Sequence, residues 1–199
     1  ASDRTLWRFT QELDMRLETQ QVQILFVHLQ PHLVVHSATE KPERIERSVK
    51  ALMDAAAAFA IPVTFALVPS DGSAPIDPLV PFVDDRNCFV AELAAPFLLD
   101  GLRHRLDGHG RPILVVCGFT TEVAVLHTVG DAIAAGYRVL VPVDTVGSQS
   151  IRAEQAALQH IDRMGGEVMS TATLLSLFAP DFRDEPGSSI VKLIRALNA

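Results

Sequence analysis

The 199-residue sequence has no long apolar run and few cysteines, and each shortage excludes a class of protein. No apolar stretch approaches the roughly 20 residues that a membrane-spanning helix needs. Residues 1–20 are charged throughout and lack the apolar core of a signal peptide. Cys88 and Cys117 form neither a disulfide framework nor a zinc-binding spacing, so we expect free thiols. These absences predict a cytoplasmic protein with no membrane partner.

Clustered basic residues are also scarce. The net charge is -7 and the pI is about 5.4, whereas binding to nucleic-acid phosphates needs grouped Lys and Arg side chains. The densest basic group is RHR at 103–105, which we interpret as a solvated helix end. His32 and His36 have a spacing that suits metal ligands on a helix, but the segment around them is not helical in pattern. We therefore expect no nucleic-acid partner, no metal and no cofactor.

Apolar residues, by contrast, make up 48% of the chain and gather in four short runs. Such runs, apolar almost without alternation, are typical of parallel strands covered on both faces. They occupy 22–28, 61–68, 111–118 and 137–144, with predicted helices at 42–60, 121–136 and 150–166. This alternation predicts an α/β protein, a three-layer α-β-α doubly wound fold with a mainly parallel central sheet.

The ends of the chain and one irregular stretch complete this interpretation. We expect one domain over 1–199, with an N-terminal helix in 1–20 and a C-terminal tail helix in 184–199 whose apolar face packs on this subunit or on another. Residues 69–96 are rich in Pro, Asp and Gly and are interpreted as a long excursion over the sheet edge. A short strand at 167–170 and a helix at 171–178 are predicted between them.

In doubly wound sheets, ligands bind at the carboxyl ends of the strands. This rule selects the residues that follow the four apolar runs: His28 to Gln30, Val68 to Ser70, Gly118 to Glu122, and Asp144 to Ser148.

Two motifs in these regions carry a family resemblance. ILFVHLQP, followed much later by VVCGFTTEVAVLHTVGDAIAAGYRVLVPVD, resembles the isochorismatase-like cysteine hydrolase superfamily, which includes nicotinamidases and N-carbamoylsarcosine amidases. The continuation HIDRMGGEVMSTATLL is similar to a branch of uncharacterised, often octameric bacterial hydrolases. The resemblance implies the predicted fold, a small-molecule ligand and a homo-oligomer.

The resemblance also implies a catalytic triad, and all three of its members are replaced in this chain. The family's Asp base falls on His28, its Lys on Arg86, and its Cys nucleophile on Ala124. A helix N-terminus lowers the pKa of a thiol and its amides can hold an oxyanion, which is why the family places its cysteine there. Ala124 removes that nucleophile, and Arg86 keeps the charge of a lysine without its geometry.

The turn around the missing nucleophile keeps its backbone. The resemblance implies that Phe119, Thr120, Thr121 and Glu122, together with Gln30, border a binding pocket, and that the peptide between Phe119 and Thr120 is cis. Thr121 and Glu122 are expected to keep a structural role. Cys88 and Cys117 are interpreted as incidental thiols, since neither lies at a helix N-terminus.

Three functions remain open at this stage. The first is a small-molecule-binding pseudoenzyme without cysteine amidase activity. The second is an active hydrolase of a small amide, carbamoyl or vinyl-ether substrate, with His28 as general base and water as nucleophile; here Glu122 or Asp144 would raise the pKa of His28. The alternative to this role as a base is that His28 is a neutral histidine hydrogen-bonded to backbone, which would leave the second function without its base. The third function is a structural oligomer subunit.

Overall fold

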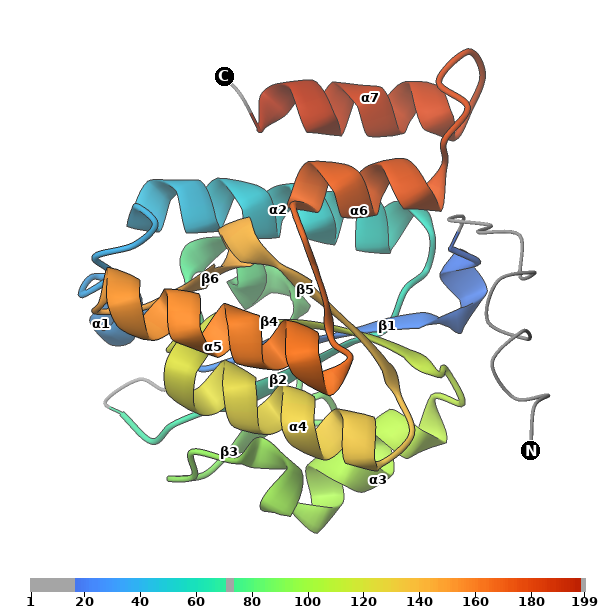
Figure 1. Cartoon of the computed structure of the whole chain (residues 1–199). Coiled ribbons are helices and arrows are strands. Elements are labelled where there is room, and N and C mark those ends of the chain that lie inside the picture. Colours follow the sequence, from blue (N-terminus) through green and yellow to red (C-terminus); the bar gives the residue numbers. More distant parts are fainter. Residues whose placement is uncertain (1–16, 71–73, 198–199) are drawn as a thin grey trace, which may run out of the picture.

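The computed structural model describes residues 17–70 and 74–197 of the chain. Within them lies a sheet of parallel strands in the order β3-β2-β1-β4-β5-β7, with β6 beside β4 (Figure 1). The strands are β1 (Val22–Val27), β2 (Val63–Leu67), β3 (Cys88–Val90), β4 (Ile113–Phe119), β5 (Arg138–Pro142), β6 (Val146–Gly147) and β7 (Glu167–Met169).

Helices cover both faces of this sheet. They are α1 (Pro31–Val34), α2 (Pro42–Ala58), α3 (Asp100–Gly108), α4 (Leu126–Ala134), α5 (Ile151–Met164), α6 (Thr171–Phe178) and α7 (Gly187–Ala196). Helices α2 and α6 lie on one face, and α3, α4 and α5 lie on the other (Figure 1). The predicted three-layer α/β fold is therefore confirmed.

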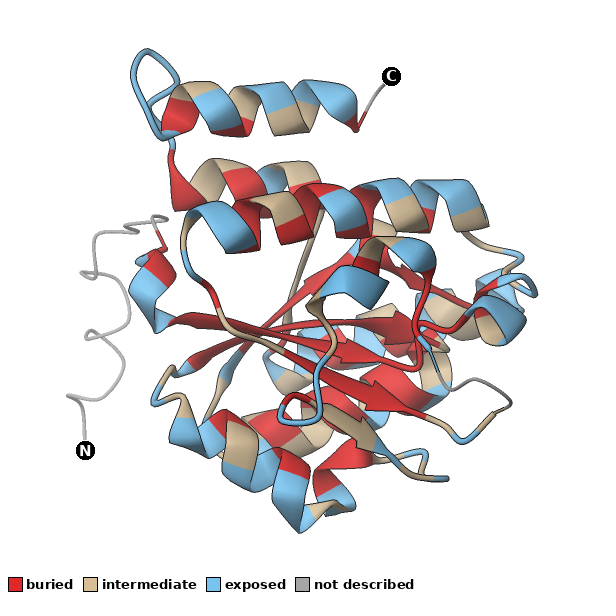
Figure 2. Cartoon of the chain, turned by 180° about the vertical axis from the view of Figure 1, so that it is seen from behind, coloured by how far each residue is buried: buried red, intermediate tan, exposed pale blue. Residues whose placement is uncertain are grey.

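The core consists of two apolar clusters, one on each face of the sheet. Because side chains alternate along a strand, Ile24 and Phe26 point into the cluster under α2, and Leu25 and Val27 point into the cluster under α4. Every residue of β1 and β4 is buried, which explains their unbroken apolar runs (Figure 2).

The four apolar runs form β1, β2, β4 and β5, but four features differ from the prediction. The segment around His32, whose pattern did not predict a helix, contains the short helix α1. The irregular stretch 69–96 contains β3, an edge strand of three residues, so Cys88 lies at the start of a strand rather than in a loop. β6, of two residues, was not predicted. The helix expected at 121–136 begins with a π-helical turn, Thr121–Val125, before α4. Elements of two or three residues are too short to give a periodic signal.

The structure describes most of the C-terminal segment but little of the N-terminal one. Most of the N-terminal helix predicted in 1–20 lies outside the described residues, and a 3-10 turn spans Thr19–Gln21. In the C-terminal segment, α7 packs its apolar face on α2 and α6 of the same chain, with Ile190 buried. Over the described ranges, no helix combines the length and apolar character required to cross a membrane.

Candidate active site

The strand order reverses direction between β1 and β4, and ligands of doubly wound sheets bind beyond the carboxyl ends of the strands at such a point; we call this region the crevice. His28 follows β1 directly, and Phe119 is the last residue of β4. Gly118 pairs with Val27 across the two strands, and a Cβ atom on Gly118 would lie 2.6 Å from the Val27 carbonyl oxygen. Glycine is therefore required where these strands approach each other beside the crevice.

The turn after β4 is fixed on two sides. The Phe119–Thr120 peptide is cis, and the Val125 N–H donates to the Thr120 carbonyl over 3.2 Å, closing the π-helical turn. The Thr121 hydroxyl lies 3.0 Å from the Gly147 carbonyl oxygen and 3.0 Å from a carboxylate oxygen of Glu154. These contacts join the turn to β6 and to the first turn of α5.

Ala124 lies within this turn and is 2% exposed. It belongs to the apolar cluster under α4, with Val125 and Val129. Its carbonyl accepts a hydrogen bond over 2.7 Å from the hydroxyl of Thr128, which lies in α4. The side chain at this position offers no nucleophile, no acid and no base.

His28 is 6% exposed and adopts a left-handed backbone conformation with φ of 53°. Its N–H donates to the Ala66 carbonyl over 2.8 Å, which holds the residue against β2. Burial lowers the pKa of His28 to about 4. The ring is therefore neutral at neutral pH.

The expectation that an acidic neighbour raises the pKa of His28 is wrong, because burial alone accounts for the lowered pKa. Asp144 is engaged elsewhere. One of its oxygens accepts from the Thr171 N–H and hydroxyl, each over 2.7 Å, and the other accepts from the Ser48 hydroxyl over 3.1 Å. Asp144 thus joins the loop after β5 to α2 and α6.

Glu122 and Glu154 form an acidic pair beside the turn. Glu154 accepts hydrogen bonds from the hydroxyls of Thr39, over 3.1 Å, and Thr121, over 3.0 Å. Burial, followed by the charges of Glu122 and Glu40, raises the pKa of Glu154 despite these hydrogen bonds. The Oε2 atom of Glu122 is buried and has no hydrogen-bond partner among the described residues. Sequence reasoning missed Thr39 and Glu154; the available signal was the position of Glu154 in the first turn of the helix that follows a strand end.

Gln30, a predicted binding residue, is fully buried, and its side-chain amide forms two hydrogen bonds to the backbone of one residue, Val68. Its Nε2 donates to the Val68 carbonyl over 3.0 Å, and its Oε1 accepts from the Val68 N–H over 2.8 Å. The amide therefore pairs with the backbone that leaves β2 and fixes the loops after β1 and β2 to each other.

Arg86 lies apart from the other predicted site residues. It is exposed in a turn that precedes β3, where its N–H donates to Asp84 Oδ1 over 2.7 Å. The carboxyl end of β3 is occupied instead by Ala91, whose N–H donates to the Leu67 carbonyl over 3.0 Å. Neither residue is a lysine, and the sequence contains no lysine between residues 51 and 191. The role assigned to Arg86 stays a prediction.

Neither cysteine is activated. Cys117 is buried within β4, and burial raises its pKa to about 12. Burial and then the charge of Asp85 raise the pKa of Cys88. A thiolate is the reactive form of cysteine, so both thiols are poor nucleophiles at neutral pH.

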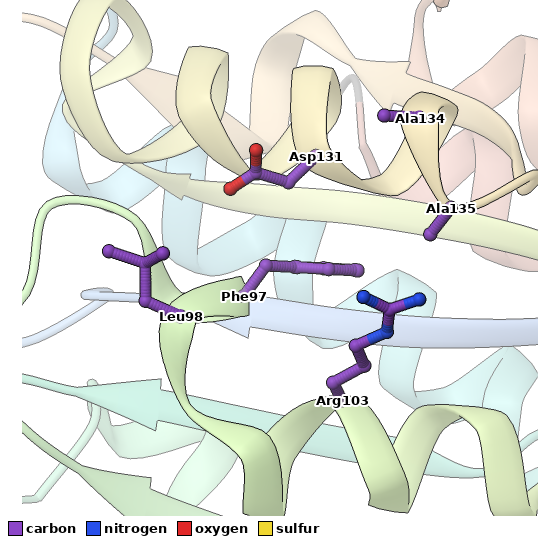
Figure 3. Close-up of a pocket in the computed structure, with 6 residues that line it drawn as sticks. All are labelled: Phe97, Leu98, Arg103, Asp131, Ala134 and Ala135. Atoms are coloured by element: carbon purple, nitrogen blue, oxygen red, sulfur yellow. The ribbon is translucent and has the colours of Figure 1, made fainter.

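Two further features lie outside the crevice. Over the residues that the structure describes, no group of three or more His, Cys, Asp and Glu side chains is placed to hold a metal ion, and His32 and His36 are exposed. A cavity of about 250 Å³ lies between the segment leading into α3 and the helix α4 (Figure 3). It is lined by Phe97, Leu98, Arg103, Asp131, Ala134 and Ala135. None of these residues belongs to the crevice at β1 and β4.

The chain is similar to known proteins in both sequence and fold. The isochorismatase domain model matches residues 22–173. The probable hydrolase YcaC of Escherichia coli is 24% identical over 193 residues, 85% of this chain and 92% of that protein. Its crystal structure, an octameric hydrolase of unknown specificity, has a TM-score of 0.83 at 20% identity and covers 92% of this chain and 94% of that one.

A second relative matches a shorter segment. N-carbamoylsarcosine amidase of an Arthrobacter species is 38% identical over 73 residues, 36% of this chain and only 28% of the amidase. The domain match, by contrast, extends from β1 to the start of α6 and so includes the crevice and its turn. The chain therefore belongs to the isochorismatase family, and it resembles the family's bacterial YcaC-like branch.

Proposed function

We propose that this hydrolase-like member of the isochorismatase family lacks cysteine amidase activity and binds a small amide, acid or aromatic ligand at the crevice between β1 and β4. The observation that carries the proposal is Ala124. It stands where the family resemblance places the nucleophile, and it is 2% exposed in an apolar cluster. Without a nucleophile at this turn, a covalent acyl intermediate cannot form.

The other groups of the described structure offer no substitute for the cysteine. The thiols of Cys117 and Cys88 both have raised pKa values, and Cys117 is buried inside the sheet. A lysine to steady developing charge is missing from the entire stretch between 51 and 191. A neutral His28 also lacks the negative charge of the carboxylate that it replaces.

What the chain retains is a backbone suited to binding. The N–H groups of the first turn of a helix have no partners within the helix and point toward a ligand at its N-terminus. Here that turn follows β4 at the crevice and is held by the Thr121 and Glu154 contact. The Val123 N–H donates to the Thr120 carbonyl over 3.2 Å, which leaves the N–H groups of Thr121 and Glu122 as donors for a ligand. These two donors do not depend on the side chain at 124, which supports binding of a carbonyl or carboxylate group.

A second candidate is a hydrolase in which His28 activates water. Its position at the carboxyl end of β1, beside the turn, favours this candidate. A general base works best when its pKa is near the operating pH. Burial lowers the pKa of His28 to about 4, which makes this ring a weaker base than a solvent-exposed imidazole and disfavours this candidate.

A third candidate is a structural oligomer subunit, and we also propose that the chain forms a homo-oligomer. The octameric assembly of the Escherichia coli YcaC supports this proposal. Sedimentation velocity would measure the assembly directly. A purely structural role and a binding role differ in whether the crevice takes a ligand.

The test is hydrolysis of a panel of small amides, carbamoyl compounds and isochorismate by the purified protein. We expect no turnover by the wild type, and none by Ala124→Cys alone, because His28 does not deprotonate the introduced thiol. The double variant Ala124→Cys, His28→Asp restores nucleophile and base together and is expected to gain slow amide hydrolysis, because the role of the lysine stays unfilled.

The His28→Ala variant controls for contaminating hydrolases. Turnover that disappears in His28→Ala would contradict the proposal and favour the water mechanism. Binding of panel members, measured by calorimetry, separates the remaining two candidates. A wild-type protein that binds none of them would favour the structural role.

A further inference from the structure

The Thr121 hydroxyl, in the turn after β4, has two neighbouring oxygens and one proton to give. Its Oγ1 atom lies 3.0 Å from the Gly147 carbonyl oxygen and 3.0 Å from Oε1 of Glu154. A hydroxyl donates one proton, and a carbonyl and an ionised carboxyl can only accept. Thr121 is fully buried, so bulk water does not reach this hydroxyl. While Glu154 is ionised, one proton therefore has to serve two acceptors.

A proton on Glu154 would supply the second donor. The carboxyl O–H could then donate to Thr121 Oγ1, and the Thr121 hydroxyl could donate to the Gly147 carbonyl. Both 3.0 Å contacts would become hydrogen bonds, and the turn would be joined to α5 and to β6 by a continuous chain. Hydrogen bonds in such a chain polarise and strengthen one another.

The surroundings of Thr39 favour Thr121 as the acceptor of this proton. Thr39 Oγ1 lies 3.1 Å from Glu154 Oε1 and already accepts from the Ser148 N–H over 2.9 Å. Its other acceptor, the Ser148 carbonyl, is 3.5 Å away, at the limit of a hydrogen bond. Thr39 therefore donates to Glu154 in either charge state. Thr121 has the nearer second acceptor and can pass its own proton on.

The charges that face Glu154 also favour its neutral form. Burial raises the pKa of Glu154, the hydrogen bonds from Thr121 and Thr39 oppose this, and the charges of Glu122 and Glu40 raise the pKa further. No Lys or Arg side chain of the described residues forms an ion pair with Glu154. Helix α4 and strand β7, which also pack on α5, contribute no charge to the shift.

We propose that a proton on Glu154 regulates the turn after β4. The protonated carboxyl donates to Thr121, which in turn donates to Gly147. When the proton leaves to water, the Thr121 hydroxyl rotates toward Glu154 and releases the Gly147 carbonyl. The turn is then fastened to both β6 and α5 at acidic pH, and to α5 alone at higher pH.

The exchange has a consequence for the ligand of the crevice, and this consequence rests on the proposed function. The N–H groups of Thr121 and Glu122 belong to the turn that loses its bond to β6. An ionised Glu154 also adds negative charge beside Glu122. A ligand carboxylate is therefore expected to bind more weakly as the pH rises through the pKa of Glu154, and a neutral amide is expected to lose less affinity.

The experiment is a carbon-13 NMR pH titration of the ligand-free protein that follows the Glu154 carboxyl and the Gly147 backbone carbonyl. We expect Glu154 to titrate above 4.5, its ordinary value, and the Gly147 resonance to move with the same midpoint. Thr121→Val removes the hydroxyl that joins the two groups and should abolish the movement of Gly147. A Gly147 resonance that ignores the titration of Glu154, or that moves as far in Thr121→Val, would overturn the proposal.

Glu154→Gln assigns the carboxyl resonance and imitates the protonated state, because its amide can donate to Thr121 and accept from Thr39. In this variant the Gly147 resonance should stay near its acid limit at every pH. Glu92→Gln, which removes an exposed carboxyl, gives the background response. The wild-type and Glu154→Gln titrations decide the matter if Thr121→Val does not fold. Because no ligand is used, the proposed function could fail without affecting this result, and the reverse also holds.

Stability gives a second readout. A raised pKa in the folded state means that the contribution of Glu154 is fully present below pH 4.5 and is lost as the pH rises through the raised pKa. The free energy of unfolding of the wild type, relative to that of Glu154→Gln, should therefore fall over this range. His28 is present in both proteins, so its own titration cancels from the difference. A difference that rises with pH over this range would contradict the proposal.

Discussion

The two edges of the sheet differ in how completely their buried polar side chains are hydrogen-bonded. At the carboxyl edge, Gln30, Thr121 and Glu154 form hydrogen bonds to backbone or to a neighbouring side chain, and Glu122 Oε2 is the one buried side-chain atom without a partner within the described residues. At the amino edge, near α3, four buried side-chain atoms of the described residues have no partner: Gln23 Oε1, Thr64 Oγ1, Arg105 Nε and His109 Nε2. The comparison teaches that the edge where the family resemblance places the site is the more completely hydrogen-bonded of the two.

The carboxyl edge is the more tightly determined of the two, and its strand contact can be broken directly. In Gly118→Ala, the new methyl would lie 2.6 Å from the Val27 carbonyl oxygen, a backbone atom that cannot turn aside. We expect the free energy of unfolding to fall by about 3 kcal/mol or more, measured by urea denaturation.

The matched control is Gly108→Ala, at the end of α3. A Cβ there has no atom within 4 Å, and alanine favours helix, so a gain of less than about 1 kcal/mol is expected. If Gly118→Ala unfolded at the same urea concentration as the wild type, the close contact of β1 and β4 would not be a constraint on this edge.

The neutral histidine at the carboxyl edge predicts a dependence of stability on pH. Because folding lowers the pKa of His28 from 6.5 to about 4, the folded state resists protonation more than the unfolded state does. The contribution of neutral His28 to the free energy of unfolding is therefore fully present above pH 6.5 and is lost as the pH falls toward 4. The loss at the acid end is on the order of 3 kcal/mol.

His28→Asn tests this dependence, since asparagine tolerates the left-handed backbone of this position. We take the difference between the free energies of unfolding of the wild type and the variant. This difference should decrease as the pH falls from 6.5 to 4, and it should stay constant above pH 6.5. A difference that does not change with pH would show that His28 protonates equally well in both states, and the carboxyl edge would then hold a usable base.

Loss of the two hydrogen bonds between Gln30 and Val68 is expected to give the smallest of the three changes in the free energy of unfolding. Gln30→Ala leaves the Val68 N–H and carbonyl without their partner, and we expect a loss of about 2 kcal/mol in the free energy of unfolding. Hydrogen exchange of the Val68 amide should accelerate in parallel. Gln21→Ala, at an exposed position, is the control and should change stability by less than about 0.5 kcal/mol. If both substitutions changed the free energy of unfolding equally, the hydrogen bonds of Gln30 to Val68 would contribute no more to stability than an exposed side chain does.

The sequence predicted the parts of the fold that depend on long apolar patterns. β1 and β4 are buried on both faces and read as unbroken runs, and their order along the chain fixed the layers. β3 was missed because a three-residue edge strand has no pattern of its own. Without β3, the loop before it could not be aligned, and the predicted position Arg86 lies at the amino end of that strand.

Candidate site residues were predictable only where a local motif holds them. His28 and Ala124 were selected by their motifs and lie on adjacent strands and turns. The charge state of His28 depends on burial by distant segments, which no local pattern records. The group RHR at 103–105 was predicted to be a solvated helix end, and the enclosure of the Arg105 Nε atom arises from packing that no local pattern records.

Helix α7 also sets the order in which the core can close. It covers α2 and α6, so residues 187–196 complete an apolar cluster begun by residues 42–58. Contacts between segments so distant in sequence form late, because closing a long loop costs entropy before the contact is made. During synthesis, the outer side of α2 therefore stays open to water until α7 has emerged, and the protein remains a target for chaperones or proteases until then.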